Sequence, residues 1–87
     1  GKSADLKIFP NPVISSTNIS FSLLTPGKTS LTIYDITGRL VKTIADKEMT
    51  EGYHQLSIDI NEMNAGIYLL RLQSQDILET KKLVVVK

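Results

Sequence analysis

The sequence predicts an all-β fold, an antiparallel sandwich of about seven strands without a disulfide, and three observations support this. Apolar and polar residues alternate with a period of two, as in ISFSL at residues 19–23, which is typical of strands with one buried face. Turn-forming residues separate such segments at intervals of about 8–12 residues, as in sandwiches. No segment shows convincing helical periodicity, although residues 61–64 are expected to allow one short turn.

The first four predicted strands span residues 5–9, 17–24, 29–35 and 39–46. The first ends at FPNPV, where two prolines remove backbone donors. The third and fourth are joined by a turn in which Asp35 is expected to bind backbone amides and Gly38 to take a positive φ, the composition of a type I turn followed by a bulge. If Asp35 pairs with Arg39, Ile33 faces Val41. Ile44 then has the wrong parity, so we predict a bulge or twist before it, unless Ile44 covers the opposite face.

The last three predicted strands span residues 53–60, 66–74 and 78–86. The first of them alternates as LSIDI. Gly66 is expected to free the backbone for entry into the second strand, which is apolar on both faces from Ile67 to Leu70. A strand of that kind is expected to be central and covered on both sides. The complete set of strands predicts an immunoglobulin-like sandwich that lacks the Cys–Trp–Cys signature.

The length of 87 residues predicts one domain spanning residues 1–87, in which residues 1–4 are a linker or cloning remnant. The balanced net charge of +1 predicts no nucleic-acid partner. No apolar run approaches the roughly 20 residues of a membrane span. The first residues, GKSADLK, also lack the apolar part of a signal peptide. The chain is therefore expected to be a piece of a longer protein.

No group of residues predicts a catalytic centre, a metal or a cofactor, so we do not expect an enzyme. His54 is the sole histidine and cysteine is absent, which leaves no triad or Cys/His metal cluster. His54 is expected to be a surface residue. The carboxylates fall mostly in turns or at polar strand positions, the usual location of solvated charge. The loop containing Asp59, Asn61 and Glu62 offers oxygen ligands for a weak cation site, although a polar loop that satisfies its own backbone is the preferred interpretation.

Four stretches of the chain together resemble a known family. They are IFPNPV (8–13), IYDITGRLV (33–41), NAGIYLLRL (64–72) and KKLVVVK (81–87). In this order and spacing the chain resembles the type A C-terminal sorting domain of cargo proteins of the type IX (Por) secretion system of Bacteroidota. The resemblance covers essentially the whole chain. Phe9 stands where the family commonly has tyrosine and Met63 where it commonly has leucine, and neither difference changes the shape enough to alter the assignment.

The resemblance implies an immunoglobulin-like fold and a role as a non-catalytic secretion signal. The cargo, an upstream domain in the same chain, is expected to cross the inner membrane by an ordinary signal peptide. The folded domain then passes through the periplasm and is recognised by the outer-membrane translocon and its shuttle protein. A surface sortase is expected to cleave the domain, which leaves the cargo at the outer membrane, on the cell surface or secreted.

Ten residues in two segments are predicted to carry recognition. The prolines of the first segment fix a stiff extended corner, which is either a docking feature or a simple strand crossover. The second segment is either a buried last strand or a tag captured by strand addition or by its terminal carboxylate. Both roles are compatible, because alternate side chains point to opposite faces. The residues are Pro10, Asn11, Pro12, Lys81, Lys82, Leu83, Val84, Val85, Val86 and Lys87.

Two alternatives remain open at the level of sequence. Besides the sorting signal, the sequence is compatible with a passive immunoglobulin- or fibronectin-like spacer and with a carbohydrate-binding module attached to a secreted enzyme. A sugar binder requires an exposed aromatic platform, which depends on whether Tyr34, Tyr53 and Tyr68 lie in solvent. Lysines beside the last strand discourage pairing between strand edges, but weak self-association through such edges is a further expectation.

Overall fold

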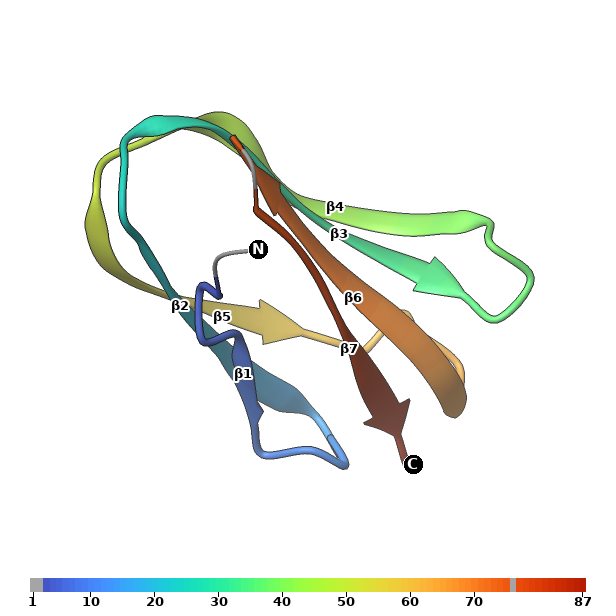
Figure 1. Ribbon diagram of the computed structural model, residues 1–87. Coiled ribbons are helices and arrows are strands. Elements are labelled where there is room, and N and C mark those ends of the chain that lie inside the picture. Colours follow the sequence, from blue (N-terminus) through green and yellow to red (C-terminus); the bar gives the residue numbers. More distant parts are fainter. Residues whose placement is uncertain (1–2, 76) are drawn as a thin grey trace.

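The computed structural model describes residues 3–75 and 77–87 and confirms the predicted all-β, immunoglobulin-like fold (Figure 1). The strands begin and end within three residues of the predicted positions. They are β1 (Lys7–Phe9), β2 (Ser16–Leu23), β3 (Gly27–Asp35), β4 (Leu40–Met49), β5 (Gly52–Asp59), β6 (Gly66–Ser74) and β7 (Ile77–Val85). The described part of the chain contains no helix with the length and hydrophobicity needed to cross a membrane.

The strands form two sheets, one with the order β1-β2-β5 and the other with the order β4-β3-β6-β7. Every pairing within these sheets is antiparallel. The chain changes sheet after β2, β4 and β5. As a result, β1 and β7 lie close together along one side of the sandwich, although they are at opposite ends of the sequence (Figure 1).

The core lies between the sheets and is built from alternate residues of each strand. In β2 the four odd-numbered residues from Thr17 to Leu23 are buried, while Ser16, Asn18 and Ser22 are exposed. The same alternation buries two hydroxyl groups on neighbouring strands, and they satisfy each other: Thr29 Oγ1 lies 2.7 Å from Ser74 Oγ. The period of two in the sequence is therefore the period of burial.

The pairing of β3 with β4 is irregular, as predicted, but one predicted pair is wrong. The register shifts twice, in the series Leu31–Ala45, Thr32–Thr43, Ile33–Lys42 and Tyr34–Leu40. One shift passes over Ile44 and the other over Val41, so Ile33 does not face Val41. An extra residue in a bulge moves every later partner by one position. The shift at Ile44 leaves Ala45 buried beneath β3, and Ile44 packs half-buried against the core.

β6 is a central strand, but the prediction that both of its faces are covered is wrong. Tyr68, Leu70 and Leu72 are buried, whereas Ile67 is 48% exposed and Leu69 is 38% exposed. The two sheets use all seven described strands, so no described strand forms a third layer over the outer face of β6. Apolar side chains therefore face solvent at the centre of the four-stranded sheet.

The N-terminal segment packs earlier than predicted, since Ala4 lies in the core and is not a loose remnant. Its side chain is fully buried, its carbonyl accepts a hydrogen bond from the Ser22 N–H, and its own N–H donates to Glu79 Oε1. Glu79 Oε2 also accepts from the Leu6 N–H at 3.4 Å. The packed domain thus includes Ala4, while residues 1–2 lie outside the described residues.

A candidate recognition surface at the proline corner and the last strand

The two segments predicted to carry recognition lie against each other in the structure. We call residues 9–13, FPNPV, the proline corner. The side chain of Asn11 reaches the outer edge of β7, where its Nδ2 donates to the Lys82 carbonyl at 2.8 Å and its Oδ1 accepts from the Val84 N–H at 3.0 Å. One amide group therefore occupies two backbone groups of an edge strand.

Val13 continues this contact with its backbone. Its N–H donates to the Val84 carbonyl at 2.7 Å, and its carbonyl accepts from the Val86 N–H at 2.8 Å. The result is a short parallel bridge between Val13 and Val85. Together, Asn11 and Val13 pair the outer edge of β7 from Lys82 to Val86. A partner that adds a strand at this part of the edge would have to displace the proline corner first.

The proline corner is also anchored to the three-stranded sheet. The Thr17 hydroxyl in β2 donates to the Pro10 carbonyl at 2.6 Å. The Phe9–Pro10 and Asn11–Pro12 peptide bonds are both cis. Pro10 and Pro12 are exposed, and so is the ring of Phe9. The corner thus presents apolar side chains to solvent while its backbone and Asn11 bind the body of the domain.

The side chains of β7 alternate between the core face and the outer face of the sheet. Those on the core face are structural, and those on the outer face are accessible. Leu83 and Val85 are fully buried in the core. Val84 is half-buried and Val86 is exposed on the outer side. Deleting the end of β7 would therefore remove core residues together with any recognition feature.

The three lysines of the tail occupy different surroundings. Lys87 Nζ donates to the Asn61 carbonyl at 2.7 Å, which ties the end of the chain to the β5–β6 loop. Lys81 lines a shallow groove between β1 and β7. Lys82 lies directly opposite Leu69 in the pairing of β7 with β6, so it stands on the outer face of the four-stranded sheet.

The β3–β4 turn is organised by Asp35. The Asp35 carboxylate accepts hydrogen bonds from the Thr37 hydroxyl at 2.5 Å, from the Thr37 N–H at 2.9 Å and from the Arg39 N–H at 3.1 Å, and it forms an ion pair with Arg39 Nε at 3.2 Å. These donors, the Thr37 hydroxyl first, lower the pKa of Asp35 to about 2. Gly38 has a φ of +88° and Gly66, at the start of β6, has a φ of +156°. Residues other than glycine rarely adopt either backbone conformation.

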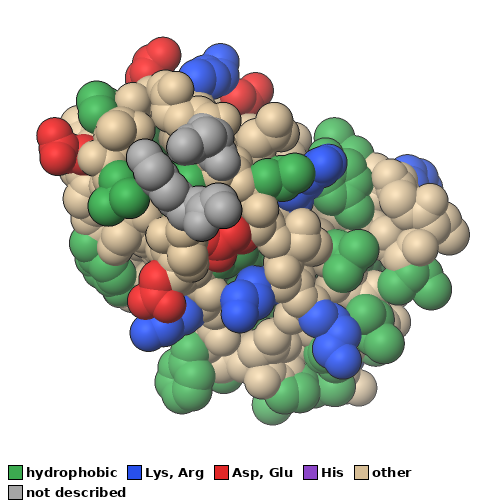
Figure 2. All heavy atoms as spheres, in the orientation of Figure 1, with side chains coloured by type: hydrophobic (Ala, Val, Ile, Leu, Met, Phe, Trp, Pro, Cys, Tyr) green, Lys and Arg blue, Asp and Glu red, His purple; other side chains and the backbone are tan. Residues whose placement is uncertain are grey.

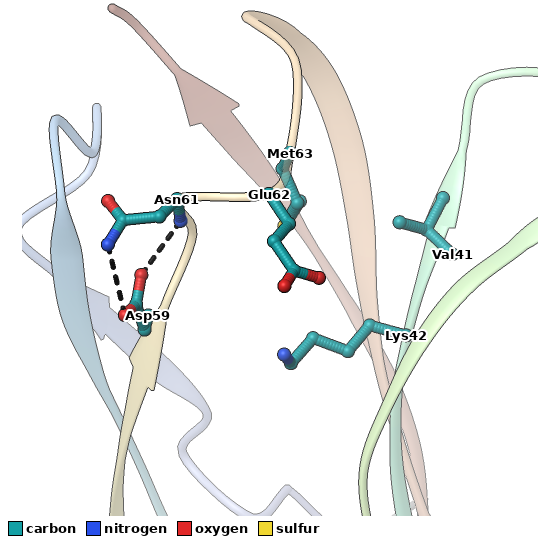
Figure 3. Close-up of a pocket in the computed structure, with 6 residues that line it drawn as sticks. All are labelled: Val41, Lys42, Asp59, Asn61, Glu62 and Met63. Carbon is teal, nitrogen blue, oxygen red and sulfur yellow. Dashed lines mark hydrogen bonds between the residues drawn. The ribbon is translucent and has the colours of Figure 1, made fainter.

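The polar loop after β5 uses its own oxygens. Asn61 donates to Asp59 twice, from its N–H to Oδ1 at 2.8 Å and from Nδ2 to Oδ2 at 3.1 Å (Figure 3). Glu62 points away from this pair and toward the ammonium group of Lys42, across a pocket that Val41 and Met63 also line (Figure 3). Among the described residues, no three Asp, Glu, His or Cys side chains converge as a metal site would require.

His54 and the tyrosines do not form a site together. The His54 ring, predicted to be a surface residue, is half-buried at the edge of its sheet. It stacks on Phe21 with a centroid distance of 5.5 Å, and its Nε2 is bonded to the Thr50 carbonyl at 2.7 Å. Tyr68 is buried, Tyr34 lies beneath Arg71, and Tyr53 is exposed on β5. These tyrosines belong to different faces of the molecule and do not form a shared platform for a sugar.

Sequence reasoning placed Asn11 in a recognition segment but did not predict its bonds to β7. It missed Glu79, whose carboxylate accepts from the backbone of Ala4 and Leu6. An asparagine between two prolines was a visible signal, because neither neighbour supplies a backbone N–H and the side-chain amide adds both a donor and an acceptor. Glu79 gave no comparable signal, since its alternating position in β7 is like that of any solvated carboxylate.

Fold and surface define the class: a small immunoglobulin-like sandwich whose last strand is bonded to a proline corner near the other end of the chain. The chain belongs to the family described as the secretion system C-terminal sorting domain, whose model matches residues 7–86. It is therefore a sorting-signal domain of the type IX secretion system. That family works attached to a cargo chain, on a route that leads to the cell surface or out of the cell.

A solved structure supports the fold. The chain is similar to part of latent PorU from Porphyromonas gingivalis, described as dimeric in its crystal structure, with a TM-score of 0.71 and 24% sequence identity. The similarity covers 93% of this chain and 9% of that chain. A search of curated proteins gave no match.

Proposed function

We propose that the domain is an export signal in which the proline corner and the last strand are recognised as one surface. The translocon and its outer-membrane shuttle protein would bind this surface while the domain is in the periplasm. A surface sortase would then cleave the domain from its cargo, and the domain itself would have no catalytic role. The observation that carries the proposal is the bonding of Asn11 and Val13 to β7, which joins two segments separated by some 70 residues of sequence.

This arrangement favours recognition of a shape over simple strand addition. The edge of β7 from Lys82 to Val86 is paired internally. A receptor would therefore contact the exposed side chains of the corner and of Val86, together with the lysines nearby. Rigid presentation of this kind lowers the entropy lost on binding. Weak self-association through the edge of β4, at the opposite side of its sheet from β7, would leave this surface accessible.

The test is a reporter fusion. A periplasmic protein carrying residues 1–87 at its C-terminus is expressed in a type IX-competent host, and surface-exposed reporter is measured by protease accessibility. We expect surface exposure for the unmodified fusion and a reporter mass that shows loss of the domain. If that fusion stays in the periplasm, the sorting function itself is wrong.

The role of the corner is tested with Asn11→Ala in the same fusion. The variant loses both bonds to β7, and we expect surface exposure to fall while the purified domain loses about 1–2 kcal/mol of unfolding free energy. Asn18→Ala is the matched control, because Asn18 is also an exposed asparagine and its side chain accepts a hydrogen bond from the Ser57 hydroxyl at 2.7 Å. A passive spacer or a carbohydrate-binding module predicts no export by any of the three fusions. Equal export by all three would show that the corner is not part of the signal.

A further inference from the structure

The outer face of the four-stranded sheet carries a continuous apolar strip. The cross-strand pairs on this face place Ile67 opposite Val84, and Leu69 opposite Tyr34. Tyr34 in turn pairs with Leu40. Because the Val84 backbone is bonded to the proline corner on its other side, Val84 and Ile67 form the closer, non-hydrogen-bonded kind of pair. The strip consists of Tyr34, Leu40, Ile67, Leu69, Val84 and Val86.

The other sheet shows that such a strip is not a requirement of the fold. The outward positions of β2 are three serines and an asparagine, and those of β5 are polar except for one tyrosine. Solvent-facing positions of this sandwich therefore accept serine, asparagine and glutamine. The cluster of leucine, isoleucine and valine is therefore specific to the outer face of the four-stranded sheet. A contiguous exposed apolar surface usually marks an interaction site.

The strip is bordered by positive charge. Arg71 follows Leu69 on the outward side of β6, and its guanidinium lies 5.8 Å from the centre of the Tyr34 ring. Lys82 stands opposite Leu69. Among the described residues, no outward-facing position of β3, β6 or β7 is acidic. The acidic residues on the outer side of β4, Asp46 and Glu48, lie at the other end of the sheet, opposite Ser30 and Lys28, and Asp46 forms an ion pair with Lys28. In Figure 2 the acidic side chains lie over one half of the view, and the half over the β3–β4 end shows hydrophobic and basic side chains.

We propose that this face is a docking surface for a protein whose contact region is apolar at its centre and carries carboxylates at its rim. The proposal rests on the proposed function, since the partner would belong to the export route. It adds a second surface, centred on β6, which meets the proposed signal along β7 at Lys82, Val84 and Val86. The apolar pairs would supply contact area, and Arg71 and Lys82 would select carboxylates.

The chemistry favours a protein over the other occupants. A membrane surface attracts amphipathic segments with many basic residues and protruding aromatic side chains. The strip on this face is bordered by two cations, Arg71 and Lys82, and contains one tyrosine, which Arg71 covers. A second copy of the chain in a two-fold interface would bring the same cationic face against itself. A partner with carboxylates meets neither difficulty.

The test uses β6, because its residues are outside the proposed tail signal. In the reporter fusion, Ile67→Thr together with Leu69→Thr removes the centre of the strip and keeps β-branched residues in the strand. We expect surface exposure of the reporter to fall about tenfold, as for loss of central interface side chains. The matched control is Leu78→Thr, an exposed leucine on the outward side of β7 at the other end of the sheet. It is expected to be exported like the unmodified fusion.

The remaining measurements separate the possible failures. Urea unfolding of the purified domains establishes that the double variant is folded. If the double variant is not folded, the Arg71→Glu variant provides the test. This substitution reverses a charge at the border of the strip and leaves the core residues unchanged, and we expect the same loss of export. Export of the folded variant at the unmodified level overturns the proposal. The proposal is also overturned if the unmodified domain forms a dimer in sedimentation equilibrium and the double variant does not. The same holds if the unmodified domain binds phosphatidylglycerol vesicles and the double variant does not. Failure of the unmodified fusion to reach the surface overturns the proposed function instead.

Discussion

Asn11 performs with one side chain what a neighbouring strand performs with its backbone. A primary amide has a donor and an acceptor with the same geometry as a peptide group, so it can bind the carbonyl of Lys82 and the N–H of Val84 together. An aspartate at this position would keep the acceptor and lose the donor. The residue type is therefore set by the edge that it covers, and the flanking prolines add no backbone donor of their own.

Asp35 predicts a pH dependence of stability. Its pKa in the folded domain is about 2, below the ordinary value of 3.8. A lowered pKa means that the carboxylate stabilises the fold above about pH 4, and that this contribution is lost as the pH falls toward 2. We expect Asp35→Asn to be less stable than the unmodified domain at pH 7, with the difference shrinking between pH 4 and pH 2 in urea unfolding curves.

The control for this experiment is Asp46→Asn. Asp46 is exposed and forms one ion pair, with Lys28 at 3.6 Å. Exposed pairs of this kind contribute little to stability, so this variant is expected to unfold like the unmodified domain at each pH. A difference between Asp35→Asn and the unmodified domain that is the same at pH 2 and pH 7 would contradict the assignment of the effect to the charge of Asp35.

At the scale of the element, β7 combines a core strand with an accessible face, and point variants separate the two. Leu83→Ala removes a fully buried side chain and is expected to lower the free energy of unfolding by about 2–5 kcal/mol. Val84→Ala changes a half-buried residue on the outer face and is expected to cost less than about 1 kcal/mol. Urea unfolding at neutral pH measures both. Similar losses for the two variants would show that the outer face is packed after all.

The strands could be predicted closely from sequence because burial follows the period of two, and β2 is the clearest example. The two errors in the sheet have a physical origin. The partner of Ile33 depends on which residue of β4 is left unpaired in a bulge, and alternation alone does not determine this. The outer face of β6 was predicted to be covered because apolar residues usually are, and sequence alone does not distinguish an apolar side chain that is covered from one that stays exposed.

The candidate recognition surface was predictable in its members but not in its assembly. Both segments were identified from their prolines, aliphatic residues and lysines. Their contact depends on β1 and β7 lying along the same side of the sandwich, which follows from sheet order and not from any local pattern. The bond from Lys87 to the Asn61 carbonyl is similar, since a flexible terminal lysine gives no indication of its acceptor.

At the scale of the whole molecule, β7 ties the two sheets together at three places along its length. Glu79 binds the backbone of Ala4 and Leu6 near the start of the strand, and Asn11 and Val13 bind its second half, from Lys82 to Val86. Just past the strand, Lys87 reaches the β5–β6 loop. Each contact joins the four-stranded sheet to the N-terminal segment, to the other sheet or to its loops. The closed side of the sandwich is thus also the side that presents the proposed signal.

This closure predicts where the domain begins. Deleting residues 1–6 removes Ala4 and Leu6 from the core and leaves the Glu79 carboxylate without its two N–H donors. We expect the chain without residues 1–6 to have a free energy of unfolding about 3 kcal/mol or more below that of the chain without residues 1–3. The longer deletion removes a buried leucine and also removes the hydrogen-bond donors of a carboxylate. Urea unfolding of the two truncated chains measures the difference. Equal stability would place the domain boundary after Leu6 and would mean that β7 holds its position without the N-terminal segment.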